Sequence, residues 1–161
     1  MALQNKLAKH ILLTGLLAGA LDATAACIQY LIRTGNNPAR VFRYIASGVF
    51  GKGALTGSLY GMAAWGLLFH MLIAMTFTIF FFLCYPQIKM LIKNKFIAGI
   101  LYGVFVWSVM NLIVVPVIYG AGIHLQLKNA LIAMGILIIA IGLPVSLMAD
   151  RYYSKNNFSK L

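Results

Sequence analysis

The sequence predicts an all-α integral membrane protein with four transmembrane helices, and three observations lead to this fold class. Of the 161 residues, 62% are hydrophobic, and the mean hydropathy is +0.91. Only 9% are charged, whereas a soluble domain carries about 25% charged residues. The apolar residues also lie in four long runs that polar segments separate. This composition excludes a soluble enzyme, because it provides too little polar surface to cover a particle in water.

The four predicted spans each have the roughly 20 apolar residues that are needed to cross about 30 Å of hydrocarbon. They cover about residues 10–32, 57–84, 96–117 and 127–149. The second is expected to end before Pro86, the third includes Pro116, and Pro144 is expected to kink the end of the fourth. We therefore expect a single membrane domain over residues 1–161.

A short amphipathic interfacial helix is predicted between the first and second spans. Asn37 and Pro38 suit an N-cap and a first helical position. After them, one face carries Arg40 and Arg43, and another carries Val41, Ile45 and Val49. Such a helix lies on a bilayer surface, and we expect Arg40, Arg43 and Lys52 to contact anionic lipid headgroups. The glycine-rich stretch that follows is either a flexible return into the second span or a re-entrant segment that lines a site.

The distribution of Lys and Arg predicts the orientation in a membrane. More cations fall on the side of the two termini and the second loop (Lys6, Lys9, Lys89, Lys93, Lys95, Arg151, Lys155 and Lys160) than on the other side (Arg33, Arg40, Arg43, Lys52 and Lys128). Cytoplasmic loops carry the excess of Lys and Arg, so we expect both termini in the cytoplasm. The tyrosines near the span ends are expected at membrane interfaces; they are Tyr85, Tyr119, Tyr152 and Tyr153.

Small residues are expected to pack these helices together, because lipid offers no hydrophobic drive for association within a bilayer. In each span they recur at spacings that keep them on one helix face. The glycines predicted to pack helices are Gly15, Gly19, Gly66, Gly99, Gly103, Gly135 and Gly142.

Three polar residues on three spans form the candidate site. At 1.5 Å per residue, Asp22, His70 and Asn111 lie about 18 to 22 Å from the inner boundary, just past the midplane. A lone charge in hydrocarbon is costly, so Asp22 is either neutral and hydrogen-bonded or ionised beside His70. Two interpretations stay open: a hydrogen-bonded clamp between helices, or a site for a ligand or a proton.

These residues leave three functional hypotheses open. The first hypothesis is a transport-like or small-ligand or proton-binding bundle, expected to be a homodimer because four spans are few for a complete path. The alternative is a non-catalytic accessory or scaffold subunit of a membrane complex, or a lipid organiser. A lipid-modifying enzyme would need His70 as a base oriented by Asp22, and no nucleophile accompanies them. No catalytic residue, metal site or cofactor is predicted, since His and Cys lack ligand spacing.

Nucleic acid is not an expected partner, although the net charge is +11. This excess arises because the chain has only two acids, Asp22 and Asp150. A nucleic-acid-binding domain instead gathers its cations on a dense face. Membrane lipids are the expected contacts, together with a second copy of the chain or a subunit of a membrane complex.

Several short motifs resemble a group of small, largely uncharacterised bacterial inner-membrane proteins called YagU-like. The motifs are Gly15-Leu16-Leu17-Ala18-Gly19, Ala46-Ser47-Gly48, Leu68-Phe69-His70, Leu101-Tyr102-Gly103 and Met110-Asn111-Leu112 with Pro116 behind it. The resemblance would cover nearly the whole chain. It implies a four-helix inner-membrane protein and assigns no catalytic or ligand-binding residue.

Overall fold

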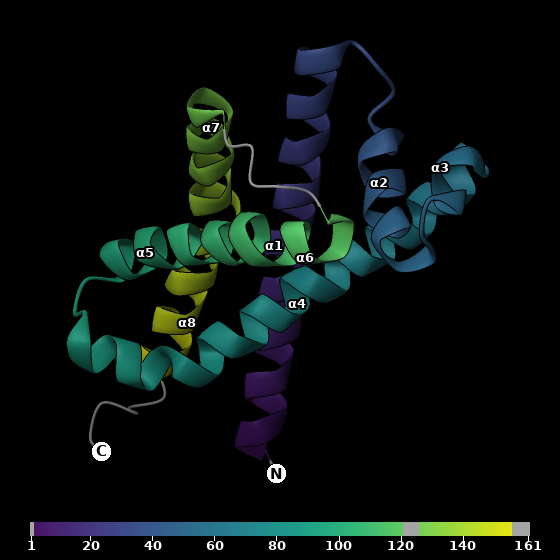
Figure 1. Ribbon diagram of the computed structural model, residues 1–161. Coiled ribbons are helices and arrows are strands. Elements are labelled where there is room, and N and C mark those ends of the chain that lie inside the picture. Colours follow the sequence, from purple (N-terminus) through teal and green to yellow (C-terminus); the bar gives the residue numbers. More distant parts are fainter. Residues whose placement is uncertain (1, 121–125, 156–161) are drawn as a thin grey trace.

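The computed structural model describes residues 2–120 and 126–155, and this part of the chain contains helices and no strand (Figure 1). Four helical segments are long and apolar enough to cross a membrane: Asn5–Thr34, Leu59–Leu91, Lys95–Tyr119 and Leu127–Lys155. The all-α class and the four long apolar helices are therefore confirmed.

The first half of the chain forms α1 (Ala2–Thr34), α2 (Ala39–Phe50), α3 (Gly53–Thr56) and α4 (Leu59–Leu91). The third segment contains α5 (Lys95–Ser108), the π-helical η1 (Val109–Val114) and α6 (Val115–Tyr119). The fourth contains α7 (Leu127–Leu137), the π-helical η2 (Ile138–Gly142) and α8 (Leu143–Lys155).

In Figure 1, α1 runs from the bottom to the top of the view, and α7–α8 runs from the top downward. Helix α4 runs from the right toward the lower left, and the segment from α5 to α6 returns from left to right. Helices α2 and α3 lie at the right, beside the beginning of α4. In this view α5 crosses α7–α8, and it is in contact with α7, η2 and α8.

Helix α4 continues through Pro86 to Leu91, past its predicted end at residue 84. Proline has no N–H, so the carbonyl four residues earlier loses its usual helical hydrogen bond. That carbonyl belongs to Phe82, and the hydroxyl of Tyr153 donates to it at 2.8 Å. The neighbouring helix α8 thus supplies the hydrogen bond that Pro86 cannot, and the helix does not end.

Both π-helical segments end two residues before a proline, Pro116 in the third span and Pro144 in the fourth. The residue just before each proline donates its N–H to the carbonyl five residues earlier, from Val115 to Met110 and from Leu143 to Ile138. A π-turn widens the helix by one residue and relieves the clash of a proline ring with the preceding turn. A π-helical stretch therefore precedes Pro144, where the sequence predicts a kink.

Glycines create the closest helix crossings. A Cβ atom added to Gly15 of α1 would lie 2.7 Å from the sulfur of Met75 in α4. One added to Gly103 of α5 would lie 2.5 Å from the Cα of Ile138, and one on Gly142 would overlap the carbonyl of Gly99. The α5–η2 crossing therefore brings backbone against backbone, which a side chain at these positions would prevent.

Gly135 does not pack helices, and this part of the prediction is wrong. A Cβ atom at Gly135 would meet nothing within 4 Å, whereas Gly142 is buried in the crossing with α5. Residues seven apart share a face in a regular α-helix. The π-helical η2 lies between these two glycines, and its extra residue per turn rotates them onto different faces.

Helix α2 forms over Ala39–Phe50, close to where the sequence predicts it, and the structure packs it against α4 and α1. Its backbone touches α4 at Gly66, where an added Cβ would overlap the carbonyl of Phe42. The side chain of Phe42 packs with Ala23 of α1 and Ala63 of α4. Helix α2 is therefore part of the folded core.

Three of the tyrosines near the span ends are buried in the main core, and their expected depth at a membrane interface stays a prediction. Tyr85, Tyr152 and Tyr153 are 2%, 3% and 9% exposed. Tyr85 donates to a carboxylate oxygen of Asp150 at 3.0 Å, and Asp150 also accepts from Lys89 at 3.0 Å. Because the hydroxyls of Tyr85 and Tyr153 have partners inside the protein, these two tyrosines can be buried without a loss of hydrogen bonds.

Candidate functional site

The crossing of α1 and α4 brings Asp22 and His70 together. Gly19 makes the approach possible, because a Cβ there would lie 2.9 Å from the sulfur of Met71. Nε2 of His70 lies 3.2 Å from the carbonyl oxygen of Gly19 and 3.6 Å from Oδ2 of Asp22. The small residue that permits the crossing thus also leaves its carbonyl open to the histidine.

The contact with Gly19 indicates which nitrogen of His70 carries hydrogen. A carbonyl oxygen only accepts, so Nε2 must donate to it. The same nitrogen lies 3.6 Å from the carboxylate of Asp22, which is close enough for an ion pair but too far for a hydrogen bond. The two side chains are only 14% and 15% exposed, and the ring of Phe42 meets the imidazole edge-on with 5.9 Å between the centroids.

Asn111 does not join this pair. Its side-chain amide donates to the carbonyl of Trp107 in its own helix at 3.0 Å. Asn111 lies in η1, where the hydrogen-bond pattern changes from α to π, and its neighbour Met110 faces the site instead. The depth along a helix can be estimated from sequence, but the angle around the helix axis changes at a π-turn.

A cavity of about 260 Å³ lies against the Asp22–His70 pair. It is formed where α1, α2, α4, the η1–α6 segment and the α7–η2 segment meet. Apart from Asp22, His70 and two tyrosines, the side chains around it are apolar, among them Ile45, Val49, Phe69, Ile73, Phe77, Met110, Val114, Ile118, Leu137 and Ile141. The cavity is therefore small and mainly apolar, with the polar side chains of Asp22 and His70 on one side.

Tyr44 and Tyr119 form another part of the wall, and the sequence did not indicate this role for either. Their rings stack with centroids 4.4 Å apart, and the hydroxyl of Tyr119 donates to the carbonyl of Tyr44 at 2.7 Å. Gly48 permits this approach, because an added Cβ would lie 2.9 Å from Ile118. Gly48 and Val49 therefore line the cavity, whereas Gly51, Gly53, Gly57 and Gly61 of the glycine-rich stretch are not among its lining residues.

The three cations predicted to contact lipid headgroups stand apart from the cavity. Arg40 and Lys52 are exposed, and Arg43 is partly buried. None of them lines the cavity. The lipid contact of the three cations stays a prediction.

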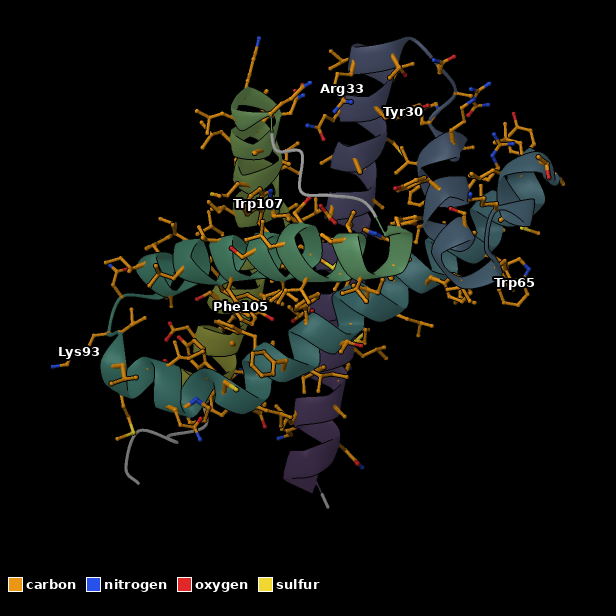
Figure 2. All side chains as sticks on the ribbon, in the orientation of Figure 1. Tyr30, Arg33, Trp65, Lys93, Phe105 and Trp107 are labelled. Atoms are coloured by element: carbon orange, nitrogen blue, oxygen red, sulfur yellow. The ribbon has the colours of Figure 1, made fainter. Side chains whose placement is uncertain are left out.

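An aromatic contact joins the end of α2 to α4. Figure 2 shows Trp65 close to α2 and α3, and its ring contacts the ring of Phe50 with 5.8 Å between centroids.

Within residues 2–120 and 126–155, no group of three or more His, Cys, Asp or Glu side chains could hold a metal ion. Comparison with known proteins finds no match for this chain among family models, curated proteins or solved structures. The resemblance to YagU-like proteins therefore stays a prediction. The function has to be argued from the chemistry of the chain itself.

Proposed function

We propose that this chain is a multi-pass protein of the bacterial inner membrane that binds a small, mainly apolar molecule through one polar group. The helices α1 and α4 have 33 residues each, which is about 50 Å at 1.5 Å per residue and enough to cross a bilayer at a tilt. Large apolar side chains such as Leu72, Leu83 and Ile139 are 54%, 61% and 70% exposed. Water would not favour so much exposed apolar surface, whereas lipid would.

The distribution of cations along the chain supports the proposed orientation. Lys93 projects from the connection between α4 and α5, and Arg33 lies in the last turn of α1 (Figure 2). The termini side carries the larger number of cations in the sequence. An excess of Lys and Arg marks the cytoplasmic side, so we place both termini in the cytoplasm and α2 toward the other face.

The observation that carries the binding proposal is that Asp22 borders a cavity and is not enclosed by polar partners. An ionised carboxylate has about four acceptor positions. In the described part of the chain, the ion-pair partner of Asp22 is His70, at 3.6 Å. A structural clamp would saturate the carboxylate between helices, whereas this arrangement leaves acceptor capacity facing the cavity.

The cavity also limits the chemistry of the ligand. Its volume of about 260 Å³ lies near the lower end of the roughly 300–1,000 Å³ of small-molecule pockets. The apolar wall suits a hydrocarbon or ring body. A hydroxyl, amine or amide N–H group would donate to Asp22, and a proton is the smallest ligand that the Asp22–His70 pair can hold.

Native mass spectrometry of protein released from lipid nanodiscs tests the proposal. Three proteins are compared: the natural chain, Asp22→Asn and the control Thr76→Val. Thr76 is exposed on α4 and bonds back to the carbonyl of Leu72 at 2.9 Å, so the control removes a polar group of the same helix away from the cavity.

We expect one discrete bound mass per chain in the natural and control proteins, and roughly tenfold lower occupancy in Asp22→Asn, equivalent to about 1.4 kcal/mol. If all three carry only the same spread of membrane phospholipids, small-molecule binding is refuted. Occupancy that Asp22→Asn leaves unchanged would make the pair a link between α1 and α4, as a scaffold would need. The mass of the released protein also tests the expected homodimer.

A further inference from the structure

A second, strongly basic groove lies between α1 and α8, near the two ends of the chain. The helices pack together there (Figure 1), with the rings of His10 and Tyr152 5.0 Å apart between centroids. The groove has a volume of about 450 Å³. Four cations line it, and two apolar residues continue it toward the span: Lys6, Lys9, Arg151, Lys155, Leu13 and Met148.

The four cations line one groove, and among the described residues no Asp or Glu lines it with them. Lys6 and Lys9 are three residues apart on α1, and Arg151 and Lys155 are four apart on α8. Residues at these spacings are neighbours on a helix surface, and like charges there destabilise the helix. The fold adds to this cost by placing both pairs at one groove. All four residues are exposed, so they are available to a ligand.

The two acids of the chain are held elsewhere in the described structure. Asp22 lies beside His70, more than three helical turns further along α1. Asp150 adjoins Arg151 in sequence, but its carboxylate is bound by Lys89 at 3.0 Å and by Lys95 at 3.5 Å. The excess charge of the groove is therefore not neutralised by either carboxylate.

We propose that this groove binds the headgroup of an anionic phospholipid from the leaflet in which the two termini lie. The guanidinium of Arg151 suits a two-point hydrogen bond to a phosphate, and the lysines add point charges around it. Leu13 and Met148 lie where the first part of an acyl chain would leave the headgroup. Basic pockets between helices on the cytoplasmic side are suited to anionic lipids for these reasons.

This inference does not depend on the Asp22–His70 cavity. It shares with the proposed function only the membrane location and the orientation. Asp22→Asn should leave binding at the groove unchanged, and loss of groove cations should leave the ligand of the cavity unchanged. The two proposals can therefore fail separately.

The test uses full-length protein in phosphatidylcholine nanodiscs that contain a minor fraction of phosphatidylglycerol. Phosphatidylglycerol that stays bound after release is measured by native mass spectrometry. The groove variant is the double substitution Lys9→Gln and Arg151→Gln. The control is Lys93→Gln with Lys128→Gln, which lowers the net charge equally at exposed positions outside the groove.

We expect the groove variant to retain roughly tenfold less phosphatidylglycerol than the control, with a difference that shrinks as salt screens the charges. Equal loss in both variants would show attraction by net charge alone and would overturn the proposal. A further arm adds inorganic phosphate to the natural protein. If phosphate displaces phosphatidylglycerol at millimolar concentration, the groove is a site for a soluble anion and the lipid assignment is wrong.

Discussion

The hydrogen bond from Tyr153 to the carbonyl of Phe82 leads to the sharpest prediction about stability. Pro86 cannot donate to this carbonyl, and the hydroxyl of Tyr153 does so from α8 at 2.8 Å. The substitution Tyr153→Phe removes the donor and keeps the ring. A buried acceptor that is left without a donor costs about 1–3 kcal/mol, and we expect that loss in the free energy of unfolding.

The cost should depend on Pro86. In a Pro86→Ala background, residue 86 regains an N–H and can donate to Phe82 within the helix. Tyr153→Phe should then cost about 0.5 kcal/mol or less, so the double-mutant cycle should show a coupling of roughly 1–2 kcal/mol. Tyr102→Phe is the matched control. Its hydroxyl donates to the carbonyl of Phe77, which also faces an ordinary N–H four residues later, at Phe81.

Thermal unfolding in a mild detergent measures these differences. For a chain of about this length, 1 kcal/mol corresponds to roughly 2–4 °C in Tm. We expect Tyr153→Phe to lower Tm in the natural background by several degrees and to have a small effect beside Pro86→Ala. Tyr102→Phe should show no dependence on residue 86. If Tyr153→Phe costs the same in both backgrounds, the hydroxyl does not compensate for the proline.

Two further predictions concern packing and charge, and the two binding tests above complete the set. Gly66→Ala should separate α2 from α4, lower Tm by several degrees and weaken ligand retention in the cavity, because its Cβ overlaps the Phe42 carbonyl. Gly135→Ala is its control and should be neutral or stabilise by up to about 1 kcal/mol, because Gly135 faces open space; equal losses of Tm in the two variants would contradict this packing. Asp150→Asn should destabilise the contact of α4, α5 and α8 by about 1 kcal/mol, since Lys89 and Lys95 lose their charged partner. Unfolding curves at low and high salt check this, and a loss that salt leaves unchanged would argue against an ionic origin.

The sequence by itself determined the class of fold and the presence of the main elements. Four apolar runs and few charges specify long apolar helices, because length and hydropathy are properties of each segment alone. Helix α2 could be placed for the same reason, since Pro38 and the pattern of apolar residues act locally. Six of the seven glycines predicted to pack helices have close neighbours across a helix contact, because small residues mark the places where helices approach.

The candidate site was predicted in part. Asp22 and His70 meet because both lie on the glycine face of their helix and at similar depth. Asn111 lies within the π-helical η1, and Gly135 is separated from the packed Gly142 by the turn of η2, so both fall outside the predicted contacts. A regular period of 3.6 residues cannot anticipate a π-turn.

Only the tertiary structure decided how residues far apart in sequence meet. The hydroxyl of Tyr153 allows α4 to pass through Pro86, the backbone of α2 lies against Gly66, and the cations of α1 gather with those of α8. Each of these depends on the relative positions of two helices, and that position follows from packing over the whole interface. The residues of a helix therefore determine its length and the polarity of its faces. Which neighbour each face contacts depends on the assembled fold.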